Sequence, residues 1–361
     1  MNFEPYSSSA GTDSPIPRVV SPDAPSSQSG IGPKHSYSSR SWFRSATEHP
    51  RSTENQEIDG FGANSNQVNL WRRSLTQIPE VMVSPYKEIL YEINGSVAVL
   101  TMNRPETLNA LTDLTQAEIR HALGESEKNA DIIGTVLTGA GRGFCSGVDM
   151  NALGAMSEAG KRLGNAHEHL ASDPGNPDDD PNFKVATAYF LGLRKPLIAA
   201  INGACAGLGF SYATFCDLRF VERTARLTTS FAQRGLIAEH GTSWMLPRII
   251  GPAHALDLLW SSRKFEGEEA YRIGYANRLC ESGECVQDAT EFLEQIAGSA
   301  APMSLMMMKK QIYRHLNQEL GSAMLESNQW MDESLARGDF KEGVSSFVEK
   351  RPPDFQRIMI D

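Results

Sequence analysis

Two short glycine-containing stretches hold the groups of this chain that could do chemistry. The first is 143–150, GFCSGVDM, and the second is 206–209, AGLG. Glycines at a corner before a helix let the backbone approach a ligand closely, because no Cβ is in the way. The first amides of a helix have no intrahelical partner, and they lie at the positive end of its dipole. The second stretch therefore predicts a place to hold an oxyanion.

The sequence on either side of this second stretch predicts how it is positioned. Residues 196–201 are almost wholly apolar, which predicts a buried central strand that ends at Asn202-Gly203. The small and apolar residues from Leu208 to Cys216 predict a buried helix. A nucleotide phosphate would be the competing ligand, but the corner lacks both the GxGxxG spacing and GK[ST].

The remaining elements follow from hydrophobic periodicity and turn residues. Strands alternate with helices up to about residue 230, and helices alone follow, which predicts an α/β core with a helical C-terminal extension. Strands are expected at 89–93, 97–102, 132–137, 218–221 and 225–228, and helices at 111–126, from Met150 onward, and at 183–193, 253–261, 267–273, 286–299, 303–320 and 323–336.

Composition excludes several classes of protein. The chain has 361 residues with 40% hydrophobic and 22% charged residues, which is ordinary for a soluble enzyme. A formal net charge of −10 argues against a nucleic-acid partner, which would need a basic face. No apolar run approaches the roughly 20 residues of a membrane span. The five cysteines form no CxxC pair, which favours reduced thiols in an intracellular protein, although Cys280 and Cys285 could pair.

Three regions are expected along the chain. Residues 1–82 are rich in Ser and Pro without apolar periodicity, which predicts a disordered tail. A core follows at 83–284 and a C-terminal helical region at 285–361. A polar, proline-broken loop lies within 157–184. His167 and His169 in it lack further metal ligands, and we expect them to face solvent. The cytoplasm is the favoured compartment, with the mitochondrion and the peroxisome as alternatives.

Five motifs together resemble the enoyl-CoA hydratase/isomerase (crotonase) superfamily, in its order and spacing, over about residues 85 to 355. They are 103–111, 143–150, 202–217, 235–251 and 347–351. The resemblance implies a fold of class α/β, with a crotonase-like spiral of ββα units and a helical trimerisation region. It implies a homotrimer or hexamer, an acyl-CoA thioester as substrate, no metal, and no cofactor, since coenzyme A is part of the substrate.

The resemblance also implies the site residues. By motif position, the backbone amides of Ser146 and Leu208 would hold the thioester enolate. Loss of one such donor typically costs about 10²–10³ in rate. Asp149 could reach the acyl chain, but we favour a role in capping the following helix. The residues implied to bind substrate are Asn109, Ala110, Ser146, Gly147, Val148, Asp149, Met150 and Gly207.

The acid–base residue implied by the resemblance is Glu239. Typical hydratases of the family carry two glutamates, whereas this chain has Ser211 and Phe231 at those positions. Glu239 matches the position of the single base in a group of Δ3,Δ2-enoyl-CoA isomerases, and one carboxylate suffices to move a proton from C2 to C4. An apolar pocket would raise its pKa, and we expect Leu236, Ile237, Trp244 and Met245 to form it. Capping or a salt bridge at the next helix is the structural alternative for Glu239.

Other functions stay open beside the isomerase. A hydratase could use Glu239 to activate water, with Ser211 or His240 ordering it, and relatives with an AEHG segment include hydratases. A non-catalytic acyl-CoA-binding scaffold is a third hypothesis, since the superfamily includes crotonase-like domains of chromatin corepressors. His240 and Ser243 suggest thioester hydrolysis, which the missing GxSxG elbow disfavours.

Overall fold

The computed structural model describes residues 85–160, 167–176 and 181–358. The predicted disordered tail, residues 1–82, lies outside these, as does part of the 157–184 loop. Within the described residues, six strands form one sheet in the order β1-β2-β3-β5-β7-β10, and four form a second sheet in the order β4-β6-β8-β9. Neighbouring strands are parallel except for the β1–β2 and β8–β9 pairs.

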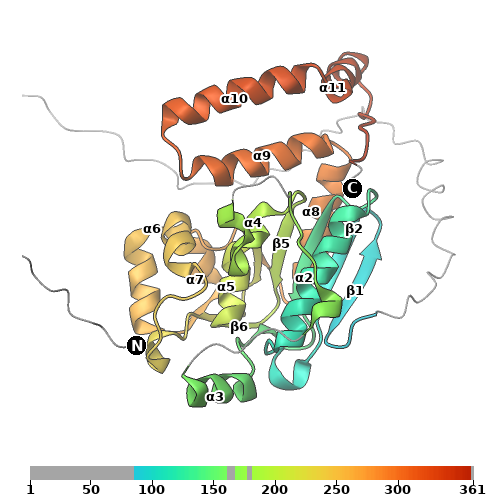
Figure 1. The fold of residues 1–361 in the computed structure, drawn as a ribbon. Helices are drawn as coiled ribbons and strands as arrows, with labels where there is room; N and C mark the ends of the chain where they lie inside the picture. Colours follow the sequence, from blue (N-terminus) through green and yellow to red (C-terminus); the bar gives the residue numbers. More distant parts are fainter. Residues whose placement is uncertain (1–84, 161–166, 177–180, 359–361) are drawn as a thin grey trace, which may run out of the picture. The chain divides into compact units, whose positions relative to one another are not determined.

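The chain repeats one unit, in which a strand of the large sheet leads to a short strand of the small sheet and then to a helix. Three such turns, β3-β4-α3, β5-β6-α5 and β7-β8-α6, wind around the core (Figure 1). The predicted ββα spiral is therefore confirmed. The strands are β1 (Ile89–Asn94), β2 (Val97–Met102), β3 (Gly134–Gly139), β4 (Gly143–Cys145), β5 (Leu197–Ile201), β6 (Ala204–Ala206), β7 (Leu218–Glu222), β8 (Arg226–Thr228), β9 (Phe265–Glu266) and β10 (Arg278–Cys280).

The helices cover the sheets and close the C-terminal end. The central strand β5 is buried at every residue, and α5 is buried along its whole length, as the apolar runs predict. The helices are α2 (Asp113–Lys128), α3 (Met150–Ala159), α4 (Tyr189–Gly192), α5 (Leu208–Phe215), α6 (Thr242–Ser261), α7 (Gly267–Arg272), α8 (Cys285–Ala297), α9 (Pro302–His315), α10 (Leu320–Leu335) and α11 (Gly338–Glu349).

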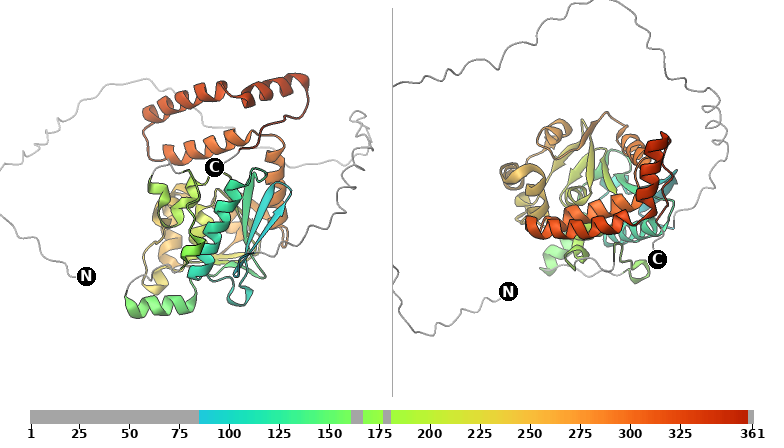
Figure 2. Two further views of the ribbon diagram at one scale, coloured as in Figure 1. Left: turned by 45° about the vertical axis from the view of Figure 1, so that its right-hand side comes forward. Right: turned by 90° about the horizontal axis from the view of Figure 1, so that it is seen from above.

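Helices α9, α10 and α11 lie across the end of the core opposite α3 (Figures 1 and 2). Asp217, just after α5, fastens α9 to the core. Its carboxylate accepts hydrogen bonds from Lys309 Nζ at 2.7 Å and from the Tyr313 hydroxyl at 2.8 Å. Large apolar side chains of the three helices remain exposed, among them Leu320 (76%) and Phe347 (84%).

Some predicted elements are wrong in extent. The expected helix 183–193 is a succession of short 3-10 turns that ends in the four-residue α4. The expected helix 253–261 begins earlier, at Thr242, and passes through Gly251, whose φ of 76° interrupts it. Strands β4, β6, β9 and β10 are missing from the prediction because two or three residues are too few to show a period.

Candidate active site

A small cavity of about 80 Å³ lies between the first residues of α3, the β6–α5 junction and the loop before α6. It brings together most of the residues predicted to act on substrate, although they come from three separate parts of the chain. It is lined by Ser146, Gly147, Val148, Met150, Leu153, Gly207, Leu208, Ser230, Phe231, Arg234, Leu236, Glu239 and His240.

Two glycine segments meet at one side of this cavity, and we call residues 145–148 and 207–209 the glycine corner. A Cβ at Gly147, where φ is 109°, would lie 3.1 Å from the Ala206 carbonyl oxygen and 3.5 Å from the Leu208 nitrogen. A Cβ at Gly209 would lie 2.6 Å from Sγ of buried Cys145. The two backbones are therefore in direct contact, and burial raises the pKa of the Cys145 thiol to about 12, which excludes it as a nucleophile.

One of the two predicted amides in the corner is available to a ligand. Leu208 is the first residue of α5, and amides at that position have no intrahelical acceptor. The amide of Ser146, by contrast, donates to the Leu108 carbonyl at 2.9 Å. The Ser146 hydroxyl also donates to a backbone carbonyl, that of Thr107, at 2.9 Å. The prediction that the Ser146 amide binds an oxyanion is therefore contradicted by its own hydrogen bond.

The neighbouring amide of Val148 is the better donor. Val148 forms a parallel bridge with Leu111, in which Leu111 N–H donates to Gly147 O at 2.7 Å and Asp149 N–H donates to Leu111 O at 3.0 Å. The N–H of Val148 itself must then face away from Leu111, and no protein acceptor for it is found in the described part of the chain. The alternation of N–H directions in this bridge identifies Val148, and not Ser146, as the donor, which motif position alone did not show.

Three residues predicted to bind substrate support the corner from behind and do not line the cavity. Asn109 is buried, and its Nδ2 donates to the carbonyls of Ala140 and Gly143 at 2.9 and 2.7 Å. The Ala110 carbonyl accepts from Arg104 at 2.6 Å. Asp149 caps α3 by accepting from the Asn151 amide at 3.0 Å, as favoured from the sequence.

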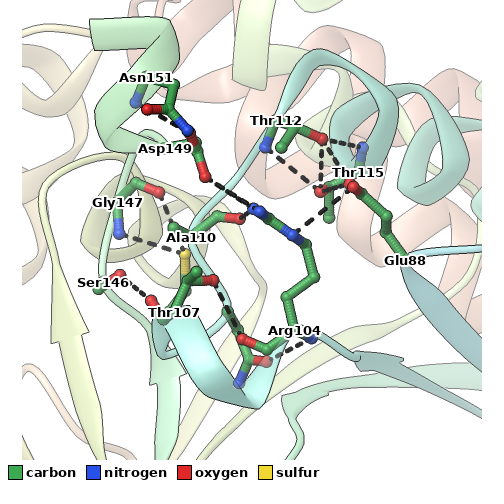
Figure 3. Close-up of polar contacts among 12 residues, drawn as sticks. Glu88, Arg104, Thr107, Ala110, Thr112, Thr115, Ser146, Gly147, Asp149 and Asn151 are labelled. Atoms are coloured by element: carbon green, nitrogen blue, oxygen red, sulfur yellow. Dashed lines mark hydrogen bonds and ion pairs between the residues drawn. The ribbon is translucent and has the colours of Figure 1, made fainter. Parts of the chain in front are cut away.

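Asp149 is also the partner of Arg104, whose Nη1 and Nη2 both lie 3.0 Å from its Oδ2 (Figure 3). Burial alone would raise the pKa of the Asp149 carboxyl. The hydrogen bonds from the Asn151 amide and from Arg104 outweigh burial, so the pKa is lowered. Asp149 is therefore a charged structural group beside Val148, with no open face toward the cavity.

Glu239 lines the same cavity from the segment 230–241, which we call the Glu239 loop. Its side chain is 27% exposed, and its Oε2 lies 3.7 Å from His240 Nε2. The N-cap of α6 is Gly241, without a side-chain hydrogen bond, so the alternative of Glu239 as a side-chain cap is not what the helix uses. In a cavity lined by a carboxylate and free amides, the carboxylate can move a proton while the amides stabilise a developing oxyanion.

The predicted apolar surroundings of Glu239 are only partly right. Leu236 lines the cavity, together with Phe231. Ile237 is 81% exposed and points away, while Met245 is buried in the main core and Trp244 packs against that core. The loop has no periodicity that would have told Leu236 from Ile237.

The side chains that other hypotheses need lie elsewhere. Ser211 is buried, and its hydroxyl is hydrogen bonded to Thr242 Oγ1 at 3.0 Å, outside the cavity lining. Ser243 is exposed and also absent from that lining, which removes the nucleophile of the hydrolase hypothesis.

A second, more open hollow of about 730 Å³ lies beyond β4, at the carboxyl ends of β3, β5 and β7. Arg142 and Arg226 line it, with Asn202 and Gly141. Arg142 precedes β4 directly, four residues before Ser146. Arg142 is not among the residues predicted from the motifs, although an arginine beside a substrate loop is a usable signal for an anionic ligand.

Three further expectations concern metal ions, membranes and the cysteines. Within the described residues, no group of three or more His, Cys, Asp or Glu side chains is placed to hold a metal ion. None of the helices described is both long and apolar enough to cross a membrane. The five cysteines are free and buried, so Cys280 and Cys285 are not joined.

Comparison with known proteins gives this geometry its context. The enoyl-CoA hydratase/isomerase family model matches residues 92–357. A short-chain-enoyl-CoA hydratase of Clostridium acetobutylicum is 31% identical, with 73% of this chain and 95% of that protein covered. The peroxisomal Delta(3,5)-Delta(2,4)-dienoyl-CoA isomerase of Arabidopsis thaliana is 30% identical, with 73% and 94% covered.

The solved structures agree with the sequences. An enoyl-CoA hydratase/isomerase from Mycobacterium paratuberculosis superposes with a TM-score of 0.65 at 27% identity, over 75% of this chain and 99% of that one. The fold, the order of the motifs and these similarities lead to the same conclusion. The chain belongs to the enoyl-CoA hydratase/isomerase (crotonase) superfamily.

Proposed function

We propose that this chain is an acyl-CoA enzyme of the enoyl-CoA isomerase type, with Glu239 as its acid–base and the amides of Val148 and Leu208 as its oxyanion donors. The observation that carries the proposal is that Glu239, Val148 and Leu208 line one cavity, in which Glu239 is the only carboxylate among the described residues, since Ser211 and Phe231 occupy the positions of the family's two glutamates. Val148 takes the role that motif position implied for Ser146.

The chemistry needs only these groups. The Glu239 carboxylate takes a proton from C2 of a 3-enoyl thioester, and the electron pair moves onto the thioester oxygen as a dienolate. The two amides stabilise that oxygen, and each is worth about 10²–10³ in rate. Return of the same proton at C4 gives the 2-enoyl thioester and restores the carboxylate, so atoms and charge balance without a cofactor.

Hydration is the second candidate, and one contact favours it. His240 Nε2 lies 3.7 Å from Glu239 Oε2, which is close enough for both side chains to hydrogen bond to one water molecule. Hydratases and isomerases both occur among the relatives named above. A non-catalytic acyl-CoA-binding scaffold remains the third candidate, and it predicts no turnover at all.

The coenzyme A portion would extend from the corner toward the hollow beyond β4. Four residues span at most roughly 13 Å between Arg142 and Ser146, so we expect Arg142 to meet the phosphates of a thioester held at the corner. Arg351 is a weaker candidate, because it is already paired with Glu342 and Glu349.

Self-association is part of the proposal. Exposed apolar side chains on α10 and α11, such as Leu325 (68%) and Val348 (72%), suit a homotrimer or hexamer. A cytoplasmic location stays a prediction, with the mitochondrion and the peroxisome as alternatives.

The experiment that tests the function is a mass-resolved assay in H₂¹⁸O. A 3-enoyl-CoA and a 2-enoyl-CoA are offered separately to the wild type and to Glu239→Gln. Conversion of the 3-enoyl to the 2-enoyl thioester without oxygen uptake, lost in the variant, supports the isomerase. An ¹⁸O-labelled 3-hydroxyacyl product reverses the ranking in favour of the hydratase. Binding without turnover of either substrate supports the scaffold.

A further inference from the structure

A polar network next to the cavity is built around Arg104, and the proposed chemistry does not use it. Arg104 lies in the break after β2, and its side chain is 19% exposed. Besides Asp149 and the Ala110 carbonyl, its guanidinium meets Glu88, with Nε 3.6 Å from Oε1 (Figure 3). Glu88 in turn accepts from the hydroxyls of Thr112 and Thr115 at the start of α2.

This network holds both sides of the bridge that orients Val148. The bridge has two hydrogen bonds, one to Gly147 O and one from Asp149 N–H, and both end on Leu111. Arg104 binds the carbonyl of Ala110, the residue before Leu111, and the carboxylate of Asp149, the residue after Val148. One planar guanidinium therefore joins the two segments whose separation sets the direction of the Val148 N–H.

An arginine suits this task in a way that a lysine does not. Its planar fork donates to the Ala110 carbonyl and to Asp149 at fixed angles, whereas an ammonium is a point charge on a flexible stem. The charges around it are two carboxylates, Glu88 and Asp149, against one guanidinium. Removing the cation would leave two anions facing one another, so truncation to alanine would confuse positioning with stability.

We infer that Arg104 is a positioning residue. By binding Asp149 and the Ala110 carbonyl, it holds the Val148 amide in the direction of the thioester oxygen. The inference rests on the proposed function only in that Val148 N–H binds the thioester oxygen. Displacement of a reacting group by about 1 Å can cost roughly 10²-fold in rate. We expect Arg104→Lys to lower kcat about 10- to 100-fold, and to change KM little.

The decisive readout does not depend on which reaction the enzyme catalyses. A saturated acyl-CoA labelled with ¹³C at the thioester carbonyl is bound to each variant, and the carbonyl stretching frequency is measured by infrared difference spectroscopy. Two aligned amides polarise the carbonyl and lower its frequency. We expect the wild type to show this shift, and Arg104→Lys and Asp149→Asn to lose part of it at saturating ligand.

A matched control separates positioning from general stability. Arg263 has a similar forked arrangement with Asp257 and Glu269. It lies just after the C-terminal end of α6 and does not line the cavity. Arg263→Lys should leave the carbonyl shift unchanged. If the frequency shift in Arg104→Lys and Asp149→Asn equals that of the wild type, or if Arg263→Lys loses as much, the inference is overturned. Absence of a shift in the wild type would instead refute the proposed oxyanion site itself.

Discussion

The two walls of the cavity are built in opposite ways. The glycine corner presents backbone amides, and its segments touch so closely that a Cβ would clash with Cys145 at Gly209 and be tightly packed against the Ala206 carbonyl at Gly147. The Glu239 loop presents a side chain from a segment in which most residues are exposed. A Cβ at Gly235 of that loop would meet no atom within 4 Å.

This difference indicates that the fold fixes the oxyanion donors, whereas a single side chain determines the proton transfer. Amides held by packing can stabilise a thioester enolate in whatever reaction follows, because every enolate places its charge on the same oxygen. The position and number of carboxylates on the loop then decide where the proton goes. Substitutions in the corner, in the loop and around them test this division.

Glu239→Gln should abolish most turnover without weakening substrate binding. General acid–base catalysis contributes about 10²–10⁴-fold, and the amide is nearly isosteric with the carboxylate. Steady-state kinetics with the better substrate from the isotope assay measures the loss of kcat. The matched control is Glu268→Gln, on an exposed carboxylate of α7 outside this cavity. Retention of full activity in Glu239→Gln would mean that the loop does not supply the base.

Leu208→Pro should lower kcat by about 10²–10³, because it deletes one oxyanion donor. Proline is well tolerated at the first position of a helix, which Leu208 occupies in α5. Leu208→Ala removes the side chain and keeps the N–H, so it controls for packing. Equal losses of kcat in the two variants would show that the side chain, and not the amide, matters.

The same methyl group should cost more in the corner than in the loop. Gly209→Ala overpacks against Cys145, and we expect it to lower the free energy of unfolding by about 1–3 kcal/mol or more. Gly235→Ala meets no neighbour and only strains a φ of 69°, which costs about 1–2 kcal/mol. Denaturant titration measures both. A larger loss at Gly235 would reverse the comparison between the two walls.

Arg142→Ala should raise KM several-fold and leave kcat nearly unchanged, since an exposed ion contact far from the thioester contributes only about 1 kcal/mol. The effect should shrink at high salt. Arg248→Ala, on an exposed residue of α6, is the control. An equal fall of kcat in Arg142→Ala would place Arg142 in the catalytic step, where the corner comparison does not expect it.

Asp149 should contribute a small, acid-sensitive part of the stability. Its pKa is lowered in the folded chain, so its contribution is complete above its unfolded pKa of about 3.9 and is lost as pH falls through the lower folded value. We expect the wild type to lose more unfolding free energy than Asp149→Asn between about pH 5 and pH 2. Parallel pH profiles of the two proteins would contradict this coupling.

Much of the fold could be predicted from local sequence. The continuous apolar run of β5 and the buried segment of α5 are long enough to identify alone. The ββα order, by contrast, was implied by the resemblance, because strands as short as β4 and β6 show no period. The helix expected at 183–193 was wrong because its apolar residues serve short 3-10 turns, and apolar spacing alone does not distinguish the two.

The sequence motifs predicted which segments form the site, but not which of their groups make the contacts. Glu239, Gly147 and Leu208 do line one cavity. The choice between Ser146 and Val148 depends on a single bridge to Leu111, a tertiary pairing that spacing does not encode. The pairing of Arg104 with Asp149 could not be predicted for a similar reason, since the two residues are 45 positions apart in the chain.

The attachment of α9 to Asp217 has a consequence for the folding of this protein during its synthesis on the ribosome. Lys309 follows Asp217 by 92 residues, and Tyr313 by 96. At about 5–20 residues per second, the Asp217 carboxylate waits roughly 5–20 seconds for both partners. During that interval the carboxylate keeps its hydrogen bond from the amide of Leu197 and meets water in the place of α9. Lys309 and Tyr313 replace that water only once α9 has been synthesised, so chains that stop before α9 lack these two contacts to the core.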